Sequence, residues 1–140
     1  MLYFAYGANM YHENMKKRCP EYKFLGRAVL KGYQFIYDGQ SRLRGGGIAN
    51  IALAPREVVW GGLYEISESE SMKLDKYEGS PKYFQRRIVP VKNDQGQILQ
   101  AMVYIRPALT QNPPSPSYKQ EVLLGAEDCG LPEDYVKNNL

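Results

Sequence analysis

One glutamate, Glu78, stands at the end of an expected helix and on its apolar side. Leu74 and Tyr77 share its face at three- and four-residue spacing, which predicts that this face points inward. Burial disfavours the charged form of a carboxylate, so we expect the pKa of Glu78 to lie above its usual value of about 4.3. A general base that works near neutral pH needs such a pKa. The alternative is a glutamate that points into water, and the pattern alone favours it.

A second candidate is the segment Tyr6-Gly7-Ala8-Asn9-Met10, which follows directly on a short apolar strand. A strand that stops at glycine and turns into a helix leaves successive backbone N–H groups unpaired. Such a turn can bind an anion or a polarised carbonyl oxygen without a charged side chain. Taken alone, the segment is more typical of plain architecture.

Tyrosines supply the remaining candidates, because the chain has 12 tyrosines and only 4 phenylalanines. Tyrosine suits half-buried positions, and a polar pocket lined by phenols is one use for this surplus. Ser115-Pro116 predicts a rigid helix start that presents Tyr118 in its first turn. Tyr118 is either a pocket phenol or a packing residue, and the pattern favours packing. Tyr83, five residues after Glu78, leaves the same two alternatives open.

Several kinds of site are excluded or disfavoured by residues that the chain lacks. With His12 as the single histidine, a Ser-His-Asp triad or a multi-histidine metal site would need unusual substitutes, and we expect His12 on the surface. No phosphate-loop or dinucleotide-binding motif is present. Gly45-Gly46-Gly47, between Arg42 and Arg44, could approach an anion, but a flexible loop is the favoured interpretation.

Length and composition predict one domain over residues 1–140. The net charge of +3 and the spread of the 18 Lys and Arg residues give no nucleic-acid-binding stripe. No apolar run approaches the ~18 residues of a membrane span. Cys19 and Cys129 lie far apart, and Met1 to Ala5 is too short for an export signal, so we expect a cytoplasmic protein with free thiols.

The apolar and β-branched segments predict mainly strands. We expect strands at 2–6, 24–38 with a break at Gly32, 48–53, 58–66, 83–91 and 98–105, with a loop at 39–47 and a turn at Ala54-Pro55. The last two should form a hairpin across residues 93–96. Successive strands without crossover helices favour antiparallel pairing.

Helix signals predict three helices and at most one further short helix after Gly130. The first should run over residues 10–19 from a cap at Asn9, and the second from a capping box at Ser67 to Glu78, with Gly79 at its end. The third should run from Pro116 to Cys129. The expected fold is α+β, a barrel-like, mixed and largely antiparallel sheet with a few surrounding helices.

Segments along the whole chain, in order, resemble those of the γ-glutamylcyclotransferase family. They are Leu2-Tyr3-Phe4-Ala5-Tyr6-Gly7-Ala8-Asn9-Met10, Gly46-Gly47-Ile48-Ala49-Asn50-Ile51, Val59-Trp60-Gly61, Leu74-Asp75-Lys76-Tyr77-Glu78-Gly79, and Pro113-Pro114-Ser115-Pro116-Ser117-Tyr118-Lys119 followed by Gly125-Ala126 and Gly130-Leu131-Pro132. The C-terminal segments make the match closer to true γ-glutamylcyclotransferases than to the wider superfamily. Where this chain has Ala8, the family usually has serine.

The resemblance implies a cytoplasmic, cofactor-independent enzyme without a metal, compatible with a homodimer. Its small-molecule substrate would be a γ-glutamyl amino acid or dipeptide, converted to 5-oxoproline and a free amine by attack of the α-amine. Carried over by position, Glu78 is the general acid and base. The implied substrate-binding residues are Tyr3, Phe4, Ala5, Tyr6, Gly7, Ala8, Asn9, Tyr83 and Tyr118.

Two alternatives use the same pocket differently. One is an enzyme that acts on γ-glutamyl amines rather than γ-glutamyl amino acids. The other is a non-catalytic protein that binds a small amino-acid derivative, against which the presence of Glu78 counts.

Overall fold

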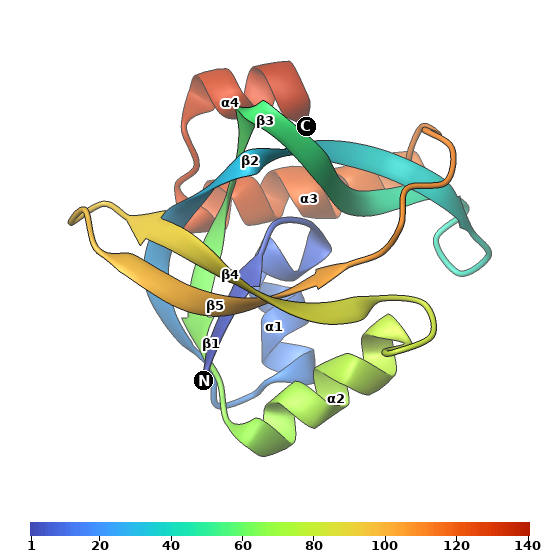
Figure 1. Cartoon of the computed structure of the whole chain (residues 1–140). Helices are drawn as coiled ribbons and strands as arrows, with labels where there is room; N and C mark the ends of the chain where they lie inside the picture. Colours follow the sequence, from blue (N-terminus) through green and yellow to red (C-terminus); the bar gives the residue numbers. More distant parts are fainter.

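Five strands close into a barrel in the order β1-β3-β2-β4-β5 in the computed structural model, which describes residues 1–140 (Figure 1). The strands are β1 (Leu2–Ala5), β2 (Lys23–Ser41), β3 (Gly46–Glu65), β4 (Gln85–Asn93) and β5 (Ile98–Ile105). All pairs are antiparallel except β1 with β5, which meet in parallel at Tyr3 and Met102. The expected barrel-like, mixed and largely antiparallel α+β fold is confirmed.

Helices surround this barrel, with α2 at its lower end and α3 behind it as drawn in Figure 1. They are the one-turn 3-10 helix η1 (Ala8–Met10), α1 (His12–Arg18), α2 (Glu68–Glu78), α3 (Pro116–Cys129) and α4 (Glu133–Asn139).

Local signals set the bounds of α2 and α3 as the sequence predicted. The Ser67 hydroxyl accepts a hydrogen bond from the Glu70 N–H, and the Glu70 side chain accepts from the Ser67 N–H, which completes the capping box. Each helix ends at a glycine in the left-handed conformation, Gly79 at φ 68° and Gly130 at φ 70°. These bounds fix Glu78 as the last residue of α2.

The turn predicted at Ala54-Pro55 is wrong, since β3 runs through it as one strand opposite β2, which is shorter by one residue. Tyr33 pairs with Leu53 and Lys31 pairs with Val58, so four residues of β3 lie opposite Gly32 alone. Gly32 has φ +88°, a conformation that other residues rarely adopt. A bulge therefore replaces the predicted turn and bends the hairpin without ending either strand.

Two predictions near the loop at 39–47 also need correction. β2 extends to Ser41 and β3 begins at Gly46, so the turn between them is short. Gly46 and Gly47 are not in a flexible loop: a Cβ on Gly47 would lie 2.0 Å from the Asn112 carbonyl oxygen. These glycines permit the proline-rich segment before α3 to pack directly on β3.

The start of the first helix differs from the prediction as well. Asn9 does not cap it, because a separate 3-10 turn at residues 8–10 precedes α1 and Tyr11 occupies the cap position. His12 is partly buried rather than on the surface, and its ring lies 4.8 Å from that of Phe24 and 5.8 Å from those of Tyr22 and Tyr64, centroid to centroid.

The core is a cluster of 32 buried hydrophobic residues. Cys19 and Cys129 are buried in it and free, which confirms the expected free thiols. None of the helices is long and apolar enough to cross a membrane.

A buried ion pair joins β2 to the segment after β5. Arg106 donates to the Asp38 backbone carbonyl at 2.7 Å, and its guanidinium lies 3.3 Å from the Asp38 carboxylate. The two side chains are only 3% and 1% exposed. The same guanidinium lies over the rings of Tyr83 and Phe84, 4.8 Å and 5.4 Å from their centroids, and so supports the segment that follows α2.

We expect Asp38→Ala to reduce the free energy of unfolding by about 3–5 kcal/mol, because it leaves the Arg106 charge buried and unpaired. The matched control is Asp94→Ala, which breaks the exposed Arg27–Asp94 pair and should cost less than about 1 kcal/mol. Urea unfolding of both variants measures the difference. Equal losses would contradict the importance assigned to the buried pair.

Candidate active site

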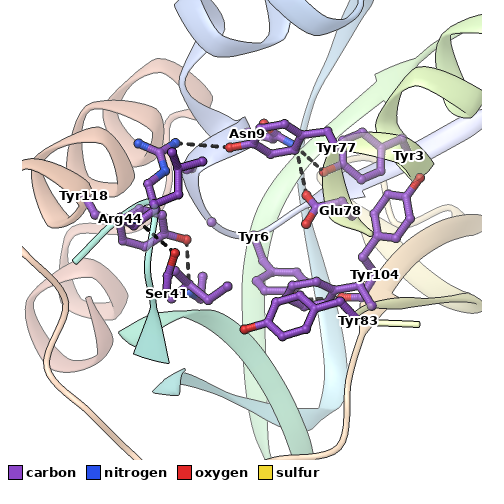
Figure 2. Close-up of a pocket in the computed structure, with 16 residues that line it drawn as sticks. Tyr3, Tyr6, Asn9, Ser41, Arg44, Tyr77, Glu78, Tyr83, Tyr104 and Tyr118 are labelled. Carbon is purple, nitrogen blue, oxygen red and sulfur yellow. Dashed lines mark hydrogen bonds between the residues drawn. The ribbon is translucent and has the colours of Figure 1, made fainter. Parts of the chain in front are cut away.

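A pocket opens where β1 ends, and six tyrosines line it (Figure 2). They are Tyr3, Tyr6, Tyr77, Tyr83, Tyr104 and Tyr118. Tyr3 and Tyr6 come from the β1 end of the barrel, and the Tyr6 hydroxyl donates to the Tyr104 carbonyl at 2.5 Å. Half of the 12 tyrosines therefore line this one pocket.

The turn that follows β1 forms part of the pocket wall through Gly7, Ala8 and Asn9. The backbone N–H groups of these three residues donate no hydrogen bond within the protein. A Cβ on Gly7 would lie 2.6 Å from the Ala49 Cβ, so only glycine permits this approach to β3. The turn thus presents unpaired donors to the pocket, as the strand–glycine–helix pattern predicts.

Glu78 is the last residue of α2, and its side chain lines the pocket. Its carboxylate faces the pocket, so the residue is only partly covered, but protein surrounds it on its other sides (Figure 2). The resulting desolvation raises the pKa of Glu78 to about 7, although the charges of Arg18 and Arg44 oppose the shift. Of the two alternatives that the sequence left open for Glu78, this geometry agrees with the inward-facing carboxylate rather than with one that points into water.

Asn9 connects Glu78 to its neighbours. Its side-chain nitrogen donates to the Tyr3 hydroxyl at 3.0 Å and lies 3.5 Å from the Glu78 carboxylate, a long contact. Its side-chain oxygen accepts a hydrogen bond from Arg18 at the end of α1. Burial and the neighbouring Glu78 both raise the pKa of the Tyr3 phenol, which therefore stays protonated.

Tyr118 belongs to both categories that the sequence left open. It is buried, and its ring packs edge-on against Tyr37. Its hydroxyl oxygen accepts the Ala49 backbone N–H at 3.0 Å, while the residue also lines the pocket. Because a hydroxyl can accept and donate together, the Tyr118 proton remains free to donate to a bound molecule.

Charged residues occupy the pocket rim. Arg44, from the turn between β2 and β3, binds both carboxylate oxygens of Glu121 on α3, at 2.8 and 3.2 Å. It also donates to the Tyr77 hydroxyl at 3.3 Å, as the dashed line in Figure 2 shows. The Arg18 guanidinium lies 3.7 Å from the centroid of the Tyr77 ring. Contacts at the rim therefore connect α1, α2 and α3 with the β2–β3 turn.

Two residues expected to bind substrate do not reach the pocket. Phe4 and Ala5 are buried in the core, at 0% and 1% exposure, and do not line the pocket. The alternation of β1 turns Phe4 away from the face that carries Tyr3, and we withdraw the direct contact for both residues. Tyr83 lies at the mouth, partly exposed.

Sequence reasoning missed the contributions of Arg18, Arg44 and Tyr104. In the sequence, Arg44 stands out only as a charged residue next to glycines. There is no local signal for Arg18 or Tyr104, because long-range packing brings these residues to the site. No group of three or more His, Cys, Asp or Glu side chains could hold a metal ion.

The closed barrel, the donor-rich turn and the single pocket carboxylate define a class of small-molecule enzymes. A model of the AIG2-like family matches residues 58–138. The fold also resembles that of a mouse AIG2-like protein, with a TM-score of 0.64 at 22% identity over 84% of this chain and 80% of that one.

Closer relatives identify the branch of this class. A γ-glutamylcyclotransferase from Bos taurus is 33% identical over 97% of this chain and 75% of its own length, and one from Homo sapiens is 32% identical over 96% and 74%. A solved γ-glutamyl cyclotransferase structure superposes with a TM-score of 0.93 at 30% identity, over 99% of this chain and 85% of the other. The chain belongs to the γ-glutamylcyclotransferase family, which confirms the resemblance found in its sequence.

We expect Tyr118→Phe to weaken both folding and substrate binding. The change leaves the buried Ala49 N–H without its acceptor, which should cost about 1–3 kcal/mol of unfolding free energy. It also removes a donor that faces the pocket, so KM should rise. Thermal unfolding and steady-state kinetics test the two parts separately. An unchanged KM in a destabilised variant would leave packing as the only role of Tyr118.

Proposed function

We propose that this chain converts a γ-glutamyl amino acid or dipeptide into 5-oxoproline and a free amine, with Glu78 as the general acid and base. The observation that carries this proposal is the Glu78 carboxylate, which faces the pocket with a pKa of about 7 beside a turn of unpaired backbone N–H groups. A group with that pKa can both accept and return a proton near neutral pH.

Glu78 serves two proton transfers at neighbouring atoms of the substrate. The α-ammonium of the substrate, with a pKa of roughly 8, first loses a proton to Glu78. The free amine attacks the γ-carbonyl carbon and closes a five-membered ring, with the charge of the broken π bond on oxygen. When the tetrahedral intermediate collapses, the oxyanion re-forms the carbonyl, the bond to the leaving nitrogen breaks, and Glu78 returns its proton to that nitrogen. The ring nitrogen, which still carries a second proton from the ammonium, loses it to the released amine, so that the products are a neutral lactam nitrogen and a protonated amine, and Glu78 is again a carboxylate. Both reacting groups belong to one molecule, so holding them in a reactive pose supplies much of the acceleration.

The turn at Gly7 and Ala8 supplies the complementary electrostatic contribution. Its free N–H groups can hold the substrate carboxylate or the developing oxyanion, and neither role requires a side chain at position 8. We assign Tyr3, Tyr6, Asn9, Tyr83 and Tyr118 to substrate contact, because all five line the pocket around Glu78.

We also propose a domain organisation, a cellular location and an oligomeric state for the protein. The single core supports one domain over residues 1–140, and the two free, buried thiols support a cytoplasmic location. A homodimer remains a further proposal, which light scattering tests.

We expect Glu78→Gln to lower kcat by about 10²–10⁴, toward the upper end because one group serves both proton transfers. The variant should fold, and above pH 7 it should be more stable than the wild type. Glu78 has a raised pKa in the folded protein, so its charge opposes folding increasingly between pH 4.5 and about 7 and fully above that range. At 1.36 kcal/mol per pKa unit the gain is at most about 3 kcal/mol.

Release of 5-oxoproline from a panel of γ-glutamyl dipeptides and γ-glutamyl amines measures the activity. Wild-type kcat/KM should fall as the pH decreases below about 7, where Glu78 becomes protonated. A folded Glu78→Gln protein with more than a tenth of wild-type turnover would remove Glu78 as the base. Turnover of γ-glutamyl amines alone would favour the enzyme that acts on γ-glutamyl amines. Binding of a γ-glutamyl compound without turnover would favour the non-catalytic binding protein.

We expect Ala8→Ser to change kcat/KM by less than about tenfold, equivalent to 1.4 kcal/mol, because backbone donors rather than the side chain supply the binding. The measurement uses the best dipeptide of the panel. A hundredfold gain would show that the serine hydroxyl of the family matters and that the natural substrate of this chain differs.

A further inference from the structure

Arg18 has a position that the proposed chemistry does not yet explain. It is the last residue of α1, it is partly buried, and its guanidinium lies over the Tyr77 ring. Arg18 forms no ion pair with any acidic side chain. Arg44, the other cation near Glu78, is paired with Glu121 through two hydrogen bonds. Arg18 is thus the cation near Glu78 whose charge no carboxylate neutralises.

The contact between Arg18 and Asn9 fixes the orientation of the Asn9 amide. A guanidinium can only donate, so the atom that faces Arg18 must be the Asn9 oxygen. The Asn9 nitrogen must then face the Tyr3 hydroxyl and the Glu78 carboxylate. Without Arg18 the amide could rotate and turn its oxygen toward Glu78, which would repel the carboxylate.

We propose that Arg18 is a positioning residue for Glu78, which acts through the Asn9 amide and through its own unneutralised charge. The mechanistic meaning of this inference rests on the proposed role of Glu78, whereas the electrostatic link itself does not. Arg18 does not line the pocket, so it has no place in substrate contact.

The electrostatic surroundings of Glu78 agree with this role. The groups that act on its charge come from β1, α1, the β2–β3 turn and α3, and they are Tyr3, Tyr6, Arg18, Arg44 and Tyr118. The three phenols have raised pKa values and remain neutral, mainly because they are buried. Of these five groups, only the two cations offset the burial of the carboxylate, and Arg18 is the larger contributor of the two.

The test compares Arg18→Met with Lys17→Met. Methionine keeps an apolar stem over Tyr77 but removes the charge and the donor. Lys17 is the exposed neighbour on the same helix, so its replacement matches the loss of charge without touching Asn9. The pKa of Glu78 is followed by NMR titration of carboxyl-labelled glutamate in the free protein, with Glu78→Gln to assign the signal.

We expect Arg18→Met to raise the pKa of Glu78 by about one, and Lys17→Met to leave it nearly unchanged. Kinetically, the acidic limb of kcat/KM should move to higher pH, and kcat at pH 7 should fall several-fold with little change in KM. Asn9→Ala should change the pKa of Glu78 and kcat less in the Arg18→Met background than in the wild type, because Arg18 acts partly through Asn9.

Equal effects of the two methionine variants, or a loss of thermal stability with an unmoved titration, would overturn the proposal. Arg18→Lys serves if the methionine variant does not fold: it keeps the charge and a donor but not the planar guanidinium, so the pKa of Glu78 and kcat should both change less than in Arg18→Met. The titration needs no turnover. A wild-type protein without cyclotransferase activity would defeat the proposed function, while the Arg18 link would still be decided by the NMR result.

Discussion

β1 lies between β3 and β5, and the pocket exists only because this short strand is held there. It pairs antiparallel with β3 over its full length and meets β5 in parallel, which closes the barrel. That placement aims Tyr3 and Tyr6 at Glu78 and ends the strand at Gly7, where the backbone turns away and leaves its N–H groups free. The close packing of Gly7 against Ala49 then fixes how near the turn lies to β3.

Within this frame, the chain holds one carboxylate where water reaches it only through the pocket. Desolvation favours the protonated form of Glu78, and the two arginines at the rim limit that effect, so the group titrates near neutrality. Stronger burial would leave Glu78 protonated near neutral pH. Closer ion pairing with the arginines would lower its pKa and make the carboxylate a weak base. The rim residues therefore contribute to the acid–base balance as well as to the packing of the helices.

Elements with local signals could be predicted from the sequence, and those set by distant contacts could not. The capping box at Ser67 and the Ser115-Pro116 start need only neighbouring residues, so α2 and α3 were predicted to within a residue. Ala54-Pro55 carries the composition of a turn, but the pairing of β2 with β3 on both sides of it overrides that preference. The Arg106–Asp38 pair and the Arg18–Asn9 contact join residues whose types reveal nothing until the barrel closes. Helix periodicity placed Glu78 on the apolar side of α2 but left its orientation open, and it gave no sign of the cations that temper its pKa.

The pocket has walls from opposite ends of the chain, and this has a consequence for biosynthesis. Tyr3 and Tyr6 leave the ribosome early, β5 emerges much later, and Tyr118 follows on α3. A nascent chain that stops before α3 cannot form the complete pocket, so a substrate cannot bind it and assist its folding. β1 must meanwhile wait for both of its neighbours, β3 and β5, with its apolar side chains unburied.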